Sequence, residues 1–192
     1  MLQPKTNDRK NEIITISANL FKEKGYSAVT MRDIAQALDI KAASLYNHIK
    51  SKQEILVLIV IEIAKEYTNT IRAIEKADET SIQKIENVIQ LHIDITVKNT
   101  NALASLNNDW MHLPPAELQY FLQMREDYEA IFRRIVKKGI ADGEIKSYNA
   151  EVIIFSILST IRTLYLWYGK NKDFSANTLK MNLKKILLEG VI

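Results

Sequence analysis

The sequence predicts an all-α protein, and three observations support this fold class. Its 192 residues include only five glycines and three prolines, whereas these two residue types make up roughly 12% of an average protein. No glycine occurs between Gly25 and Gly139, although a β-sandwich or a doubly wound sheet would need many turn residues over such a stretch. Apolar residues recur with helical spacing along most of the chain. We therefore predict about nine helices and no sheet.

The composition is that of a folded, water-soluble protein, with 47% hydrophobic and 26% charged residues. The absence of cysteine excludes disulfides, thiolate metal ligands and cysteine nucleophiles. Residues 1–19 carry several charges and lack the apolar core of a signal peptide. We expect a cytoplasmic protein that needs no metal and no cofactor.

The first helix is predicted at residues 8–24. Ile13, Leu20 and Phe21 fall on one side of it, which marks the face that packs. Gly25 follows the last periodic residue, and glycine is common just after a helix end because it adopts left-handed backbone angles without strain.

Two short helices follow, at residues 30–38 and 41–48. Thr30 and Asp33 have the spacing of a capping box, with aspartate in place of glutamate, so both side chains can satisfy free backbone amides at the helix start. Two helices joined by such a tight turn form a helix-turn-helix, whose second helix fits the major groove of B-DNA. Their crossing needs a small residue at the contact and apolar residues on both arms. The sequence supplies Ala35, Ile34, Leu38, Ile40 and Leu45 at these places.

The remaining helices are predicted from caps and apolar spacing. Ser51 and Glu54 form a second capping-box pattern, Pro115 suits a first helical turn, and Gly139 is expected to end the longest helix. The predicted helices lie at residues 51–76, 82–98, 115–138, 150–168 and 175–188, with a less regular segment at 101–112.

The last two helices carry more apolar surface than the core of one subunit is expected to bury. One packing face of the final helix consists of Leu179, Leu183, Ile186 and Leu187. We predict that residues 150–188 form a homodimer interface, a four-helix bundle with two helices from each subunit. A membrane span is not expected, because Arg162 interrupts the one long apolar stretch and a central arginine costs about 2.5 to 3.5 kcal/mol on insertion.

Charge is distributed unevenly along the chain. Residues 1–52 carry nine basic and five acidic side chains, whereas residues 53–192 carry seventeen and eighteen. A basic segment attached to a nearly neutral one is typical of a nucleic-acid-binding domain joined to a domain with another function. We predict a domain boundary between residues 52 and 53.

Residues 9–56 resemble the DNA-binding domain of the tetracycline-repressor (TetR) family of bacterial transcriptional regulators. The matching residues are 21–26, Thr30, 33–35, 45–46 and 48–56. The resemblance implies a homodimeric repressor that binds a palindromic DNA operator and is released by a small molecule. Residues 53–192 would then be the effector-binding and dimerisation domain.

The match departs from the family pattern at three places in the helix-turn-helix. Asp39 stands where the turn usually has glycine, and Ile49 replaces a common phenylalanine. Aspartate tolerates left-handed backbone geometry better than most residues, so we expect the turn to persist. The recognition helix carries Lys41, Ala42 and Ala43 where other members vary, so the operator sequence does not follow from the resemblance.

The resemblance also implies which residues contact DNA. Tyr46, Lys52 and Thr30 would bind phosphates, with His48 as a further candidate. Bases would be read from the recognition helix and the helix before it, since lysine or arginine suits guanine, asparagine suits adenine and alanine suits the thymine methyl group. The candidates for base reading are Lys41, Ala42, Ser44, Asn47 and Arg32.

No ligand motif is shared across the family, so effector contacts are argued from chemistry. Candidates are polar or aromatic groups that interrupt apolar helix faces: Tyr67, His92, Trp110, Tyr128, Arg162 and Tyr165. A site lined in this way favours a mostly apolar effector. Arg162 either holds an anionic effector or forms an ion pair within the protein. His92 and the aromatic residues could instead be ordinary core side chains.

Two rival functions remain open at this stage. An enzyme is disfavoured, because the chain has three histidines and none of the common nucleophile, phosphate-loop or metalloprotease motifs. Asp109 and His112 have a spacing that could ligate a metal, but one pair is a weak signal. The other rival is a dimeric DNA-binding protein without an effector. The operator sequence, the regulated genes, the effector and the sign of regulation do not follow from the sequence.

Overall fold

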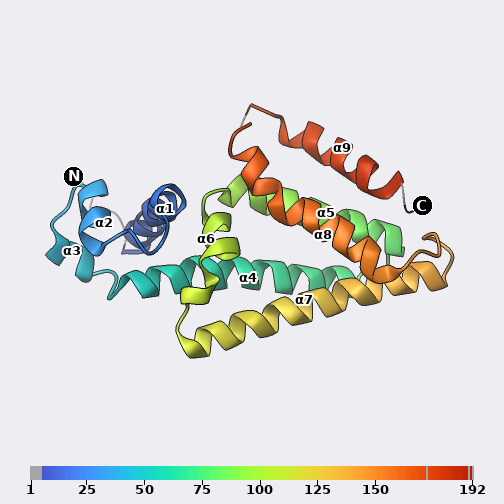
Figure 1. The fold of residues 1–192 in the computed structure, drawn as a ribbon, viewed down its shortest axis with the longest axis horizontal. Coiled ribbons are helices and arrows are strands. Elements are labelled where there is room, and N and C mark those ends of the chain that lie inside the picture. The colour runs from blue at the N-terminus through green and yellow to red at the C-terminus, as the bar shows by residue number, and fades with distance from the viewer. Residues whose placement is uncertain (1–5, 172, 190, 192) are drawn as a thin grey trace. The chain divides into compact units, whose positions relative to one another are not determined.

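A computed structural model describes residues 6–171, 173–189 and 191, and within these ranges the chain is helical with no strand. The α-helices are α1 (Thr6–Lys24), α2 (Met31–Ala37), α3 (Ala42–Tyr46), α4 (Lys52–Lys76), α5 (Ser81–Asn99), α6 (Ala102–Asn108), α7 (Pro115–Ala141), α8 (Ala150–Tyr168) and α9 (Ala176–Glu189), with a 3₁₀ helix η1 (Trp110–His112) before α7 (Figure 1). The predicted all-α fold is confirmed.

The helices form two compact units. Unit 1 comprises the chain up to Ile63 together with Asn101–Phe121, and unit 2 comprises Ala64–Thr100 and the chain from Leu122 onward. The boundary predicted between residues 52 and 53 concerns independently folding domains, and it stays a prediction.

Unit 1 is built around a core from α1, α2 and α3. Ile13, Phe21, Ile34 and Leu45 are at most 2% exposed, so the small helix-turn-helix obtains its core largely from α1. The segment that begins at Asn101 packs on α1. The Asn101 side chain accepts a hydrogen bond from Lys22 at 2.8 Å and donates one to Asn19 at 2.5 Å.

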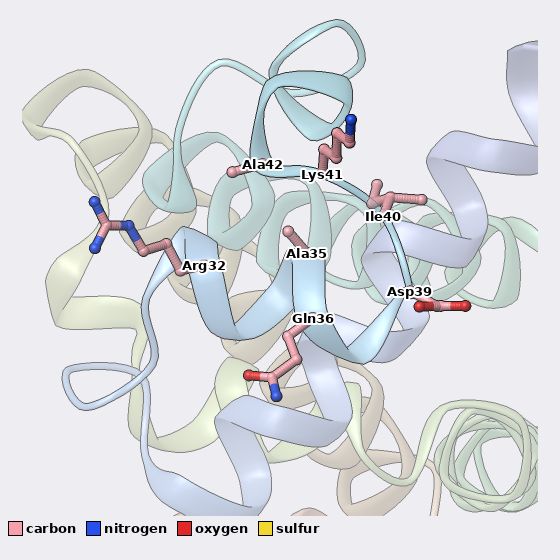
Figure 2. Close-up of a pocket in the computed structure, with 7 residues that line it drawn as sticks. All are labelled: Arg32, Ala35, Gln36, Asp39, Ile40, Lys41 and Ala42. Carbon is pink, nitrogen blue, oxygen red and sulfur yellow. The ribbon is translucent and has the colours of Figure 1, made fainter.

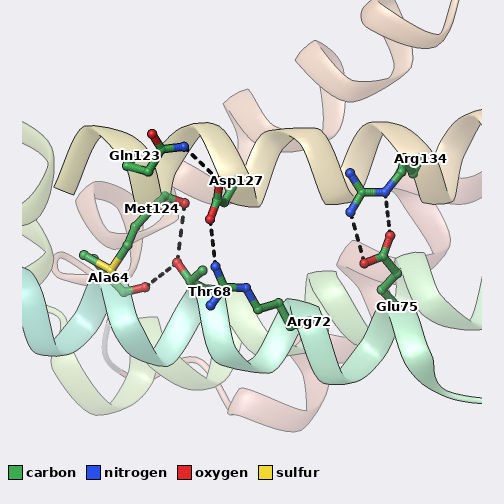
Figure 3. A network of polar contacts seen from close by, with 8 residues as sticks. All are labelled: Ala64, Thr68, Arg72, Glu75, Gln123, Met124, Asp127 and Arg134. Atoms are coloured by element: carbon green, nitrogen blue, oxygen red, sulfur yellow. Dashed lines mark hydrogen bonds and ion pairs between the residues drawn. The ribbon is translucent and has the colours of Figure 1, made fainter. Parts of the chain in front are cut away.

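Unit 2 has α5 at its centre, in contact with both α8 and α9. The parts of α4 and α7 in this unit are joined by a row of polar contacts (Figure 3). Thr68 donates to the Met124 carbonyl at 3.4 Å, Arg72 pairs with Asp127 at 2.7 Å, and Arg134 binds both carboxylate oxygens of Glu75.

Gly139 does not end α7, contrary to the sequence prediction. A Cβ atom at this position would lie 2.6 Å from Ile145 and 2.8 Å from Ser81, so the glycine allows a close approach of neighbouring segments. The left-handed turn residue is Gly143 instead, with a φ of 75°. A capping box that was not predicted begins α5, where Thr80 and Gln83 satisfy each other's backbone amides.

Helix α8 has a buried apolar face and an exposed face that mixes large apolar residues with serine and threonine. It is long and apolar enough to cross a bilayer by length and composition, and 39% of its most apolar window is buried. On α9, Leu179 is buried and Leu183 and Leu187 pack partly against the core of unit 2, whereas Ile186 is 70% exposed. The face predicted for α9 is therefore mostly used within the subunit.

Candidate nucleic-acid interface

The turn between α2 and α3 has the left-handed geometry that the sequence predicted. Asp39 has a φ of 52° and is the one residue other than glycine with a positive φ in the described ranges. Its amide donates to the Gln36 carbonyl at 3.1 Å, and the Ile40 amide donates to the Ala35 carbonyl at 3.0 Å. These two hydrogen bonds form a Schellman motif, which ends α2 and turns the chain toward α3.

The start of α2 is fixed by the predicted capping box. The Thr30 hydroxyl accepts from the Asp33 amide at 3.2 Å, and the Asp33 carboxylate accepts from the Thr30 amide at 2.7 Å and from the Thr30 hydroxyl at 2.6 Å. Hydrogen bonds from the Thr30 hydroxyl and then from its amide hold the pKa of Asp33 below its usual value. The orientation of α2 is thus set at both ends.

The predicted DNA contacts lie on the outside of this helix pair. On α3, the side chain of Leu45 is fully buried, whereas that of Tyr46 is 52% exposed. The exposed candidates are Thr30, Arg32, Lys41, Ser44, Tyr46 and Asn47, and the half-buried ones are Ala42, His48 and Lys52. The recognition helix therefore packs through one apolar side and leaves its polar side free.

A hollow of about 530 Å³ lies between α2 and the start of α3 (Figure 2). It is lined by Arg32, Ala35, Gln36, Asp39, Ile40, Lys41 and Ala42. Three of these are predicted base-reading residues. Gln36 was not predicted, and its exposed position on the same helix face as Arg32 is the signal that could have found it.

Lys52 is held by the protein itself. Its Nζ atom donates to the carbonyls of Tyr26 and Val29 at 2.7 Å each and to the Ser27 carbonyl at 3.3 Å, and it lies 4.3 Å from the centre of the Tyr26 ring. Desolvation lowers the pKa of this ammonium. An ammonium has three N–H donors, so all three are used within unit 1.

His112 stacks on the ring of Tyr26, the same ring that Lys52 contacts. Its ring lies 5.1 Å from that of Tyr26 with an interplanar angle of 25°, and its carbonyl accepts from Gln53 at 3.1 Å. The spacing of Asp109 and His112 suggested a possible metal site. In the described ranges, no three His, Asp or Glu side chains lie close enough together to hold a metal ion.

The structure brings together three of the six predicted effector contacts. Tyr67 on α4, His92 on α5 and Tyr128 on α7 form a cluster in unit 2, with ring centres 4.5 to 6.0 Å apart. Tyr165 is buried on α8. Trp110 belongs to unit 1, where it packs on Phe121 at 5.9 Å.

Arg162 forms an ion pair within the subunit. Its guanidinium lies 2.8 Å from Glu129, and both side chains are about one-third exposed (29% and 33%). Of the two roles considered for Arg162, the structure shows the internal pair. Glu129 was missed because its partner lies 33 residues away in sequence.

Comparisons with known proteins agree with this geometry. Residues 13–59 match the family described as bacterial regulatory proteins, tetR family, and residues 78–191 match the tetracyclin repressor-like C-terminal domain. The transcriptional repressor KstR2 of Rhodococcus jostii is 24% identical over 185 residues, covering 95% of this chain and 91% of that protein. The negative transcriptional regulator IcaR of Staphylococcus aureus is 50% identical over 46 residues, covering 24% of this chain and 25% of that protein.

A solved structure shows the same fold. The ketosteroid transcriptional regulator KstR2 of Mycobacterium tuberculosis superposes with a TM-score of 0.89 at 19% identity, over 100% of this chain and 98% of that one. Together, the helix-turn-helix and these matches define a DNA-binding transcriptional regulator and not an enzyme. The C-terminal match alone spans more than half of the sequence, and the chain belongs to the TetR family of bacterial regulators.

Proposed function

We propose that this protein is a homodimeric transcriptional repressor that binds a palindromic DNA operator and is released by a small, mostly apolar effector. The observation that carries the DNA-binding part is the helix-turn-helix, with α2 fixed at both ends and the polar side of α3 exposed. The repressor role is supported by the names of the relatives. Such a regulator acts in the cytoplasm, where bacterial DNA lies.

The proposed DNA contacts are made by side chains that are exposed or half-buried on and around α2 and α3. Tyr46 would bind a phosphate, with His48 beside it, and these contacts would place α3 in the major groove. The Thr30 amide and hydroxyl both donate to Asp33, so the role of Thr30 would be to cap α2. Bases would be read by Lys41, Ala42, Ser44, Asn47 and Arg32. Because the Lys52 ammonium already donates to three carbonyls, its role would be to position the connection between α1 and α2.

The dimer would form through the exposed face of α8 with a second copy of this chain. This face carries Val152, Phe155, Leu166 and Trp167, whose exposed fractions are 42% to 71%. Their spacing places them along one side of the helix. Between the two apolar ends, the same side carries the exposed small polar residues Ser156, Ser159, Thr160 and Thr163. Exposed large apolar side chains at both ends of one helix face are typical of a subunit interface. Pairing about a two-fold axis would present two α3 helices to a palindromic site.

The effector would bind in unit 2, at the cluster of Tyr67, His92 and Tyr128. The relative KstR2 is named as a ketosteroid regulator, which favours a lipophilic molecule for this chain also. The alternative is a dimeric repressor without an effector.

Selection from a random pool of double-stranded DNA, with and without cell extract, tests the proposal. We expect a palindromic sequence to be enriched and the extract to weaken its binding. Enrichment of a palindrome without any effect of extract would favour the alternative without an effector. No sequence preference even at low salt would contradict the DNA-binding proposal itself.

A further inference from the structure

The core of unit 2 contains a polar cluster in otherwise apolar surroundings. The Nε2 atom of His92 lies 2.8 Å from the hydroxyl of Tyr128. Both side chains are almost fully buried, at 3% and 4% exposure. The Tyr67 ring lies over the imidazole, with 4.5 Å between centres, and it is only partly buried. Tyr67 is the most exposed of the three side chains.

Both partners of this hydrogen bond are neutral near pH 7. Burial lowers the pKa of His92 to about 3, with a smaller contribution from the Arg162 charge. Burial also raises the pKa of the Tyr128 hydroxyl above its usual value. A neutral histidine and a neutral tyrosine carry two polar hydrogens between them, one N–H and one O–H.

Only one of these two hydrogens is used in the bond between the two side chains. If tyrosine donates to Nε2, the free hydrogen is on Nδ1 of His92. If histidine donates, the free hydrogen is on the Tyr128 hydroxyl. Nδ1 of His92 has no hydrogen-bond partner. In either tautomer, the core therefore holds one buried donor without an acceptor, an arrangement that is costly unless something binds it.

The missing partner is an acceptor, and the surroundings favour a neutral one. The cation that influences His92 is Arg162. It already pairs with Glu129 at 2.8 Å, a carboxylate that Arg125 approaches at 3.8 Å. A carboxylate moved next to His92 would lose its hydration without gaining a free cation. A carbonyl oxygen accepts the same hydrogen at a much lower desolvation cost.

We infer that the effector of the proposed regulator is an apolar molecule with a neutral carbonyl oxygen, which accepts the free hydrogen of the His92 and Tyr128 pair. This inference rests on the proposed effector-responsive function. It names the chemical group that the effector must carry and the two side chains that recognise it.

Thermal unfolding of the full chain with matched probes tests this inference. The probes are androstanone with androstane, methyl nonyl ketone with undecane, and decanoate as the anionic counterpart. We expect each ketone to raise the Tm more than its hydrocarbon and to bind with a Kd about tenfold lower. Decanoate should shift the Tm less than methyl nonyl ketone.

Two variants separate recognition from folding. Tyr128→Phe leaves His92 with a free donor, so it should lower the Tm of the unliganded protein yet retain the preference for ketones. The double variant His92→Leu with Tyr128→Phe replaces both partners by apolar groups, which is close to neutral for stability. It should unfold at or above the Tm of Tyr128→Phe and bind ketone and hydrocarbon equally.

Three results would overturn the inference: equal shifts with ketone and hydrocarbon, no shift with any probe, or a ketone preference that survives in the double variant. A larger shift with decanoate would also contradict it. DNA binding is measured on the same preparation without probes. Its loss would count against the proposed function, whereas the thermal shifts judge the carbonyl site alone.

Discussion

The Nζ atom of Lys52, at the start of α4, donates a hydrogen bond to the backbone carbonyl of Val29 at 2.7 Å. With its bonds to the carbonyls of Tyr26 and Ser27, it ties the first turn of α4 to the connection between α1 and α2. That connection leads directly into Thr30, the N-cap of α2. A side chain on α4 thereby fixes the start of the helix-turn-helix.

Replacing Lys52 distinguishes positioning from phosphate contact. We expect Lys52→Met to lower operator affinity while leaving the slope of log affinity against log salt unchanged, because no charge facing DNA is removed. Lys41→Met serves as the comparison, since Lys41 is exposed at the start of α3. As a base-reading residue whose charge would face the DNA, Lys41→Met should relax the preference at one base pair and reduce the slope by at most about one. Binding titrations at several salt concentrations measure both, and a slope change of about one in Lys52→Met would assign that side chain to a phosphate.

The Tyr46 hydroxyl is predicted to bind a phosphate. Tyr46→Phe removes one hydrogen bond, so operator affinity should fall about three- to tenfold, while the Tm stays constant because the side chain is 52% exposed. Tyr148→Phe is a matched control, since Tyr148 is 55% exposed in unit 2. Equal affinities for the two variants would argue against this contact.

The exposed face of α8 is predicted to be the dimer interface. Phe155 is 71% exposed, so Phe155→Glu should leave the fold of the subunit intact. In a dimer formed through this face, it would bury a carboxylate from each subunit and cause dissociation. Light scattering after gel filtration should then give the subunit mass, with loss of operator binding. Tyr120→Glu, at a 50% exposed position in unit 1, should remain dimeric. A dimeric Phe155→Glu would place the interface elsewhere.

The burial of His92 predicts a pH dependence of stability. Its pKa falls from 6.5 to about 3 in the folded protein. Between these two values, the unfolded chain binds a proton that the folded core excludes. The free energy of unfolding should therefore decrease as the pH drops from 6.5 toward 3, by at most about 1.4 kcal/mol per pH unit from this residue. Above pH 6.5 its contribution is constant.

Denaturant titrations at several pH values measure this effect. The double variant His92→Leu with Tyr128→Phe lacks the group and should lose stability less steeply in acid than the wild-type protein. Identical pH dependence in the two proteins would show that His92 titrates normally, and hence that it is not buried as described.

The fold class and most helix boundaries could be predicted from the order of the amino acids alone. These depend on signals between neighbouring residues, such as the Thr30 and Asp33 capping box, the left-handed Asp39 turn and the apolar spacing of Ile13 and Phe21. Each requires only a few adjacent residues to have particular chemistry. The family resemblance followed from the same local pattern.

The long-range partners of these side chains became visible only in the folded chain. In the folded protein, the Lys52 ammonium donates to the connection before α2, Arg162 pairs with Glu129, and Gly139 lies against Ser81. His92 is also hydrogen-bonded to Tyr128, and Trp110 lies in the other unit. Helical periodicity gives the face on which a residue lies, whereas its contacts depend on how separate helices pack, which no spacing along one helix specifies.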